Sequence, residues 1–250
     1  MTLPWRVVWI TGASTGIGAE VAMQLAKAGV KVATSARSAD TLAANAVGQP
    51  NLKPFPLDVT DAAAVAETFK RVELELGAID LIIAGAATYT PVDSRSIDPA
   101  DFDRMYRVNY LGVINVIAAA LPTFRQRHAG HLSWIASVAG YRGLPKAAAY
   151  GPTKAALINL AESLKPELEI EGVQVSVINP GFVKTPMTTQ NDFEMPFLME
   201  VADAAKATIA GLAKGQFEVA YPAPFVAILK FARLLPYRAF FAFVRRFVLK

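Results

Sequence analysis

The segment Tyr150–Lys154 reads Tyr-Gly-Pro-Thr-Lys and places a phenol and an amine four residues apart. If residues 150–171 form one helix, both side chains project from the same face. A tyrosine titrates near pH ~10, and a neighbouring cation lowers that pKa. Such a phenol can pass a proton to a carbonyl oxygen or take one from an alcohol. A Tyr and a Lys at this spacing also occur on exposed helix faces, so the assignment depends on the rest of the chain.

Composition favours a protein with a large core and excludes some chemistries. Of the 250 residues, 53% are hydrophobic and 18% are charged, which suits one large α/β domain or two small ones. The absence of cysteine excludes disulfides and thiolate metal sites. The chain has only two histidines, His128 and His131, which nearly excludes a zinc site or a Ser-His-Asp triad. We expect both at a surface turn and no bound metal.

The positive charge is concentrated at the end of the chain. The net charge is +4, but six Lys and Arg residues and no acid follow Glu218, which leaves about −2 elsewhere. The main body therefore does not resemble a nucleic-acid binder. No signal-peptide pattern precedes the first predicted strand, so we expect a cytoplasmic protein.

A phosphate-binding element is predicted near the start of the chain. The apolar run 6–11 is typical of a strand buried on both faces, and a glycine-rich turn and a helical stretch to Ala28 follow it. Glycines let the backbone approach a pyrophosphate, and the helix N-terminus offers free N–H groups to it.

The residue after the second predicted strand, 30–36, bears on the choice of dinucleotide. An acid there would bind a ribose 2′-hydroxyl, whereas a basic residue suits a 2′-phosphate. Arg37 follows the small Ala36, which favours NADP(H) over NAD(H). The alternative is an arginine that is merely paired at the surface.

Further strands alternate with helices along the chain. We predict strands at 52–57, 79–84, 130–137, 173–179 and 217–221, with helices at 60–76, 99–107, 109–127 and 150–171 between them. This alternation predicts a Rossmann-like, doubly wound parallel sheet of about seven strands in a three-layer α/β fold.

Taken in order, these motifs make the chain resemble a short-chain dehydrogenase/reductase over residues 5 to about 221. The glycine turn matches the family's Thr-Gly-x-x-x-Gly-x-Gly pattern, Asp58 matches the aspartate at the adenine ring, and Pro180-Gly181 with Thr185 matches the loop that receives the nicotinamide. The catalytic set of the family matches Asn109, Ser137, Tyr150 and Lys154.

The resemblance implies a role for each member of that set. Tyr150 would be the general acid in reduction and the base in oxidation, and Lys154 would lower its pKa and hold the nicotinamide ribose. Ser137 would orient the substrate oxygen, and Asn109 would hold a water that links Lys154 to solvent. The expected cofactor contacts are Thr11, Gly12, Ser14, Thr15, Gly16, Ile17, Gly18, Arg37, Ser38, Asp58, Val59, Ala84, Gly85, Ala86, Tyr150, Lys154, Pro180, Gly181, Val183 and Thr185.

Two positions depart from the family pattern. Ala84-Gly85-Ala86-Ala87 stands where Asn-Asn-Ala-Gly is usual, and Thr15 stands where many NADP-preferring members carry a basic residue. The preference for NADP(H) therefore depends mainly on Arg37.

The loop 186–199 is rich in Met and Phe, which suits a lipophilic substrate. The alternative is that these side chains only pack the loop. We expect substrate contacts from Ser137, Tyr150, Met187 and Tyr141, with Tyr89 nearby.

Residues 223–250 form a basic, aromatic segment outside the resemblance, so we expect a catalytic domain over 1–222 and an amphipathic tail over 223–250. Pro236 divides the tail into two helices, and Arg238, Ala242, Arg245 and Arg246 share one face of the second. It lacks the ~18 apolar residues that span a bilayer, but it suits peripheral contact with a membrane surface. It could instead dock on a partner subunit or cover the substrate cleft.

The sequence thus predicts an NADP(H)-preferring oxidoreductase that interconverts a carbonyl and a secondary alcohol on a lipophilic small molecule. By analogy with the family, we expect a homodimer or homotetramer. The rival hypotheses are a catalytically silent dinucleotide-binding sensor and a membrane-associated scaffold. A silent protein has no chemical need for all four catalytic residues.

Overall fold

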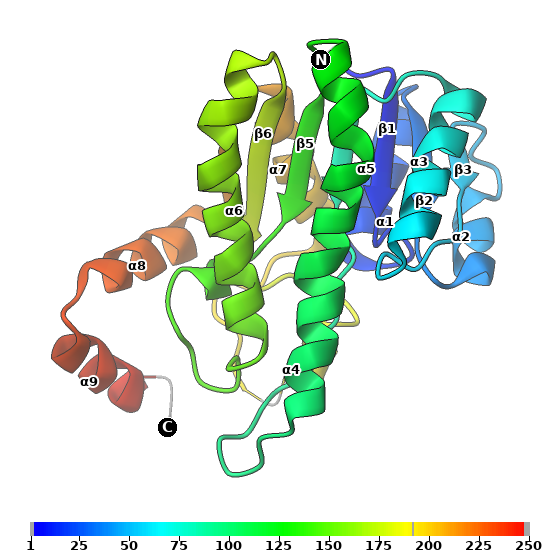
Figure 1. Ribbon diagram of the computed structural model, residues 1–250. Helices are drawn as coiled ribbons and strands as arrows, with labels where there is room; N and C mark the ends of the chain where they lie inside the picture. Colours follow the sequence, from blue (N-terminus) through cyan, green and yellow to red (C-terminus); the bar gives the residue numbers. More distant parts are fainter. Residues whose placement is uncertain (1–2, 192, 248–250) are drawn as a thin grey trace.

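The computed structural model describes residues 3–191 and 193–247 (Figure 1). Its seven strands form one parallel sheet in the order β3-β2-β1-β4-β5-β6-β7, which confirms the predicted fold class. The strands are β1 (Val7–Thr11), β2 (Lys31–Ser35), β3 (Leu52–Pro54), β4 (Leu81–Ala84), β5 (His131–Ile135), β6 (Gln174–Pro180) and β7 (Glu218–Tyr221).

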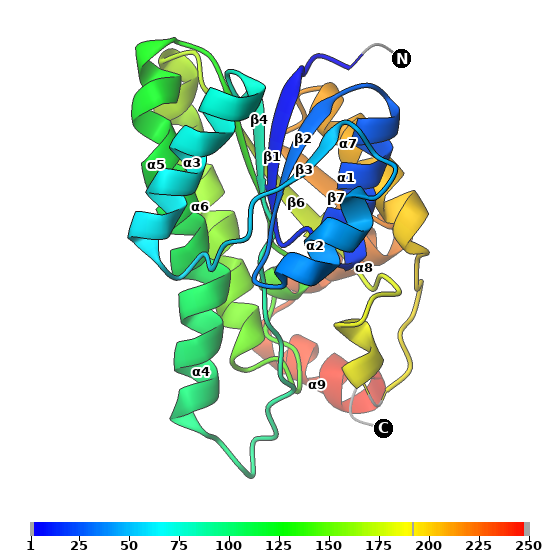
Figure 2. The ribbon, with the colours of Figure 1, turned by 90° about the vertical axis from the view of Figure 1, so that its right-hand side faces the viewer.

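Helices cover both faces of this sheet (Figure 2). One layer holds α1 (Gly16–Lys27), α2 (Ala39–Ala46) and α7 (Val201–Ala213), and the other holds α3 (Ala62–Leu76), α5 (Gly112–Gln126) and α6 (Tyr150–Ile170). The remaining helices are α4 (Pro99–Tyr106), α8 (Ala223–Leu234) and α9 (Tyr237–Phe247), with short turns η1 (Arg107–Leu111), η2 (Val138–Gly140) and η3 (Thr188–Gln190).

The strands are apolar throughout because they are buried on both faces. In β1, Val7 and Trp9 pack into the core on the α3 side, whereas Val8 and Ile10 pack into the core on the α1 side. Successive side chains of a strand point to opposite faces, so one short apolar run contributes to both cores.

Two helix boundaries differ from the prediction. Helix α3 begins at Ala62 and not at residue 60, because Asp61 caps it and its carboxylate accepts from the Ala64 amide at 3.0 Å. The Thr60 hydroxyl donates instead to Asp58 at 2.8 Å. The two helices predicted on either side of Val108 are one continuous helix, because a π-helical turn, η1, joins α4 to α5. By length and apolar composition this stretch, 99–126, could cross a membrane; here it packs beside the sheet.

Helix α8 belongs to the main core. Phe225, Val226 and Leu229 pack into the cluster that also holds the side chains of α3, α5 and α6. Helix α9 packs on α8 through Phe240 and Val244. Residue 222 therefore does not mark the edge of the packed core, although the sequence suggests a boundary there.

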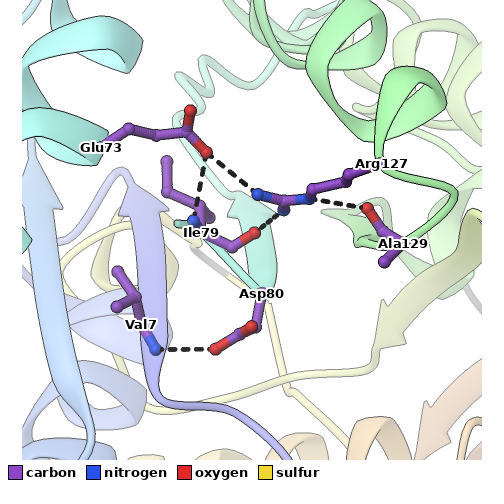
Figure 3. Close-up of polar contacts among 6 residues, drawn as sticks. All are labelled: Val7, Glu73, Ile79, Asp80, Arg127 and Ala129. Carbon is purple, nitrogen blue, oxygen red and sulfur yellow. Dashed lines mark hydrogen bonds and ion pairs between the residues drawn. The ribbon is translucent and has the colours of Figure 1, made fainter. Parts of the chain in front are cut away.

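An arginine network holds the amino-terminal edge of the sheet (Figure 3). The Arg127 guanidinium lies 3.1 Å from the Glu73 carboxylate and donates to the backbone carbonyls of Ile79 and Ala129. Glu73 also accepts from the Ile79 amide at 3.2 Å. The network joins α3, the start of β4 and the end of α5, far along the strands from the motifs with expected chemistry.

His131 lies in the same region and is buried, so the expected surface position is wrong. Its Nε2 lies 2.8 Å from the Ser176 hydroxyl, and burial lowers the pKa of the imidazole to about 4, with a smaller effect from the Lys165 charge. The apolar surroundings of a parallel strand explain this, because His131 is the first residue of β5. His128 is exposed, as expected.

Candidate active site

The glycine turn lies at the carboxyl edge of the sheet, where β1 and β4 are neighbours. The chain leaves β1 for α1 on one face and leaves β4 for α4 and α5 on the other. In open α/β sheets, ligands bind in the crevice at such a switch point. The first turn therefore lies where the fold can accept a dinucleotide.

Two glycines of the turn are sterically required. Gly12 has φ +72°, and a Cβ there would lie 2.5 Å from the carbonyl carbon of Gly85. A Cβ on Gly18 would lie 2.5 Å from the Gly12 carbonyl oxygen. The Gly85 amide donates to the Thr11 hydroxyl at 3.2 Å, which ties the ends of β1 and β4 together. Both glycines are therefore required by the close approach of the protein backbone at the ends of β1 and β4.

The start of α1 meets the loop after β6. Gly16 has φ +61°, and a Cβ there would lie 3.2 Å from the Thr185 methyl group. Thr15 is the N-cap residue but makes no capping bond, so the first amides of α1 keep their capacity to bind an anion. Asn45, which the sequence analysis missed, donates to the Ser14 carbonyl at 3.0 Å and fixes the turn.

Arg37 and Asp58 lie together at the ends of β2 and of the segment after β3. Arg37 is exposed, and within the described part of the chain no ion pair or hydrogen bond of its side chain is seen. Hydrogen bonds from Thr60 lower the pKa of the exposed Asp58, and the charge of Arg37 lowers it slightly further. Ser38 caps α2 by accepting from the Thr41 amide at 3.3 Å, and Val59 is buried.

Ser137, Tyr150 and Lys154 come together where β5 ends and α6 begins. The Ser137 hydroxyl lies beside the Tyr150 phenol, accepts from the Ala139 amide at 3.1 Å and donates to the Pro180 carbonyl at 3.4 Å. The Lys154 ammonium nitrogen lies 5.4 Å from the centroid of the Tyr150 ring. The predicted helical spacing therefore does place the phenol and the amine side by side.

Burial sets the pKa values of this pair. It raises the pKa of the Tyr150 phenol, an effect that the neighbouring Ser137 hydroxyl reduces and the Tyr89 phenol increases. It lowers the pKa of Lys154 to about 7. The pKa of Tyr150 is therefore raised in this structure and not lowered as expected, because the loss of hydration is the largest effect on the phenol.

Buried polar contacts fix the position of the lysine and the asparagine. The Lys154 ammonium donates to the Ile135 carbonyl at 2.8 Å. Asn109 accepts from the Thr88 amide at 2.7 Å and donates to the Thr88 carbonyl at 2.9 Å. It also donates to the Thr153 hydroxyl at 3.3 Å, which joins η1 to α6. A π turn inserts one extra residue into a helix and is common at functional sites. Here the π turn η1 directs Asn109 toward α6.

A protein-family model described as short chain dehydrogenase matches residues 6–195. An uncharacterized oxidoreductase of Myxococcus xanthus is 36% identical over 249 residues, which cover 98% of both chains. The chain belongs to the short chain dehydrogenase family. It is an oxidoreductase with the family's Rossmann-like fold.

Two solved structures show the same architecture. A short chain dehydrogenase from Burkholderia cenocepacia J2315 in complex with NADP is 26% identical, with a TM-score of 0.84 over 98% of this chain and 99% of that one. A 3-ketoacyl-(acyl-carrier-protein) reductase from Brucella melitensis complexed with NADH is 24% identical, with a TM-score of 0.79 over 86% and 96%. The second likeness shows the fold alone.

One of the residues expected to contact the substrate in this short chain dehydrogenase, Tyr141, is directed elsewhere. Tyr141 is buried, and its hydroxyl donates to Glu218 on β7, so it is not directed to the Ser137 and Tyr150 hydroxyls. Tyr89 lies against Tyr150 instead, with ring centroids 5.2 Å apart. Only the fold could distinguish the two tyrosines, since both flank the motifs in the sequence.

The loop after β6 packs partly on α8. The centroid of the Phe182 ring lies 5.8 Å from that of Phe193 and 5.4 Å from that of Phe225. The ring centroids of Phe197 and Phe225 are 6.0 Å apart. Met187 is half-buried, and Phe193 and Phe197 are exposed. Part of this apolar loop therefore packs against the protein, and part remains accessible beside the carboxyl edge.

Two surface cavities of about 510 and 540 Å³ lie elsewhere and contain none of the four predicted catalytic residues.

Proposed function

We propose that this protein is an NADP(H)-preferring oxidoreductase that interconverts a carbonyl and a secondary alcohol on a lipophilic small molecule. The observation that carries the proposal is that the Ser137 hydroxyl and the Lys154 ammonium both lie beside the Tyr150 phenol at the carboxyl edge of the sheet. Two hydroxyl groups at one point can both contact a substrate oxygen, which is the arrangement that proton transfer to or from that oxygen requires.

The surroundings of this point fit a nicotinamide dinucleotide. Gly12, Gly18 and Gly85 leave no room for side chains along the turn, and the start of α1 can bind a pyrophosphate. Asp58 and Val59 would border the adenine, Tyr150 and Lys154 the ribose, and residues 180–185 the nicotinamide. When bound, the nicotinamide supplies or accepts the hydride, and the protein contributes position and electrostatics.

The proton chemistry is assigned to the chain's own residues. A raised pKa keeps the Tyr150 phenol protonated at neutral pH, which suits the general acid of a carbonyl reduction. Ser137 would donate a hydrogen bond to the substrate oxygen and hold it in reach of that phenol. Lys154, with a pKa near 7, would exchange protons readily at neutral pH, and Asn109 would keep η1 and α6 in register beside it.

The preference for NADP(H) is supported by Arg37, which is exposed at the end of β2 next to Asp58. A guanidinium in this position can bind a 2′-phosphate with a bidentate hydrogen bond. The Burkholderia neighbour contains NADP, which agrees with this assignment. The Brucella neighbour contains NADH, so the fold accepts either dinucleotide and the side chain after β2 has to discriminate.

Fluorescence titration of NADPH and NADH tests the cofactor assignment. We expect the wild type to prefer NADPH and Arg37→Ala to lose at least about tenfold in NADPH affinity while NADH affinity stays unchanged, because only the phosphate contact is removed. Arg6→Ala, at the opposite edge of the sheet, is the matched control and should bind both nucleotides as the wild type does. Equal binding of both nucleotides by the wild type would overturn the NADP(H) preference.

The lipophilic substrate is supported by Met187 and by the exposed Phe193 and Phe197 beside the carboxyl edge. We expect turnover in a series of ketones to rise with the length of the apolar group, since each buried methylene contributes about 0.8 kcal/mol. Rates that are highest for small polar ketones would contradict this assignment.

A homodimer or homotetramer is supported by the outer face of the α4–η1–α5 helix. Tyr106 and Leu111 are exposed there, and the Tyr106 ring lies 5.1 Å from that of Tyr110. Sedimentation velocity should show an oligomer that Tyr106→Glu and Leu111→Glu weaken together. A monomeric wild type would contradict this expectation.

A further inference from the structure

Helix α8 is apolar on two opposite sides. Phe225, Val226, Leu229 and Ala232 are buried against the protein. On the other side, Ile228, Phe231 and Leu234 are exposed. Residues three apart on a helix are neighbours, so these three form a continuous stripe.

Helix α9 also exposes aromatic side chains. Tyr237 and Phe241 are exposed, and their rings stack with centroids 5.8 Å apart. We call this surface the outer stripe. It consists of five side chains that are 43–81% exposed, Ile228, Phe231, Leu234, Tyr237 and Phe241.

Arg142 fixes the corner between the two helices. Its guanidinium donates to the carbonyls of Arg233 at 2.8 Å and Leu235 at 3.2 Å, and it lies over the rings of Tyr237 and Phe240 at 5.0 and 4.4 Å. The two helices therefore present the outer stripe as one formed surface. Arg142 belongs to the loop that carries Ser137 at its start and Tyr150 at its end, so this surface is attached to the candidate active site.

The surface differs from the one that the sequence suggests. Phe240 and Val244, two of the apolar residues of the predicted amphipathic helix, are buried against α8. They are not available to a ligand. The exposed apolar area comes mainly from α8 and from the first turns of α9.

The charged residues of α8 and α9 are all positive. Arg233, Arg238, Arg245 and Arg246 are exposed, and within 3–191 and 193–247 no acidic residue is paired with them. No Asp or Glu follows Glu218 in the sequence. Exposed apolar side chains bordered by arginines are typical of surfaces that lie in the interface of an anionic membrane.

We propose that the outer stripe docks on an anionic lipid surface, with its apolar side chains in the headgroup region and its arginines on lipid phosphates. A second copy of the chain fits less well, because an isologous contact would bring two copies of the same positively charged patch together. The location also agrees with the proposal, because α8 and α9 lie beyond the carboxyl ends of the strands (Figures 1 and 2). Docking there would place the candidate active site near the lipid, and this inference does not depend on the proposed activity.

Vesicle flotation with the full chain tests the proposal. The vesicles are phosphatidylcholine alone or phosphatidylcholine mixed with phosphatidylglycerol. We expect the wild type to float with the anionic vesicles only, and added salt to weaken binding. Phe231→Glu with Leu234→Glu should reduce binding at least about tenfold, because two inserting side chains are replaced by charges.

Two further variants make the test specific. Leu74→Glu with Ile170→Glu is the matched control, since these residues are 86% and 89% exposed on α3 and α6; it should bind as the wild type does. Arg238→Glu with Arg245→Glu should abolish the preference for anionic vesicles. Circular dichroism and thermal unfolding verify that each variant is folded.

Several outcomes would overturn the proposal. These are the absence of flotation at low salt, equal flotation with neutral vesicles, and equal losses in the stripe and control variants. Sedimentation velocity adds one more outcome: a wild-type oligomer that the stripe variant dissociates would assign the outer stripe to a contact between copies.

Discussion

At the scale of single residues, the candidate active site depends on how far the phenol and the ammonium are removed from water. Ser137 lies beside Tyr150, and the Lys154 ammonium donates to the Ile135 carbonyl within the protein. Burial therefore keeps the phenol protonated and makes the ammonium easier to deprotonate. This combination favours a proton donor at neutral pH rather than a resident phenolate.

Tyr150→Phe tests the role of the phenol. We expect turnover to fall by about 10²–10⁴-fold, the usual contribution of general acid catalysis, while NADPH affinity is retained because the ring remains. Steady-state kinetics and nucleotide titration measure the two effects separately. Tyr106→Phe, an exposed tyrosine on α4, should keep full turnover. Undiminished turnover in Tyr150→Phe would remove this residue from the chemistry.

At the scale of elements, the glycine turn is constrained by contact as well as by conformation. Gly12 and Gly48 have nearly the same φ, +72° and +71°, but a Cβ would meet the Gly85 backbone only at Gly12. A substitution at Gly48 therefore reports backbone strain alone, whereas one at Gly12 reports strain together with a steric clash.

Gly48→Ala should cost about 1–2 kcal/mol of unfolding free energy, since an L-residue is strained at this φ. Gly12→Ala should cost more and should also abolish nucleotide binding, because β1 and β4 have to move apart. Urea unfolding and fluorescence titration measure the two effects. Equal effects of the two substitutions would show that the close contact with Gly85 does not matter.

Arg142 is the second feature at this scale, because it joins the loop between β5 and α6 to the corner of α8 and α9. In Arg142→Ala we expect the amide hydrogen exchange of α9 to accelerate by about tenfold or more, since hydrogen bonds from a charged group contribute about 1.5–3 kcal/mol. Arg95→Ala, whose arginine pairs with Asp93 at the surface, should leave that exchange unchanged. An unchanged exchange rate in Arg142→Ala would mean that packing alone holds α9.

At the scale of the whole molecule, stability is expected to depend on the pH through His131. The unfolded histidine has a pKa near 6.5, whereas burial lowers it to about 4 in the folded protein. Between these values the unfolded state binds more protons, so stability falls as the pH falls from 6.5 to 4. The loss for this group should be about 3 kcal/mol.

Urea unfolding of the wild type and His131→Asn, from pH ~7.5 down to pH ~4.5, measures this dependence. We expect the variant to lose less stability than the wild type over this range, because the asparagine does not titrate. His128→Asn, at the exposed histidine, should keep the wild-type profile. Parallel profiles for the wild type and His131→Asn would assign the acid sensitivity to other groups.

The sequence alone determined the fold class and the family of this protein. Apolar strands with helical segments between them predict a parallel sheet, since only strands buried on both faces lack alternation. The spacing of Tyr150 and Lys154 and the glycine turn also follow from local geometry. Such features are encoded within a few residues of one another, so they can be predicted before folding is considered.

The tertiary structure decided everything that depends on burial and on distant neighbours. It reversed the direction expected for the Tyr150 pKa, placed His131 inside, and directed Tyr141 to Glu218 instead of the substrate side. It also turned the apolar side of α9 against α8 and left the outer stripe exposed. The physical reason is that hydration, and therefore charge and exposure, is set by residues that meet only when the chain folds.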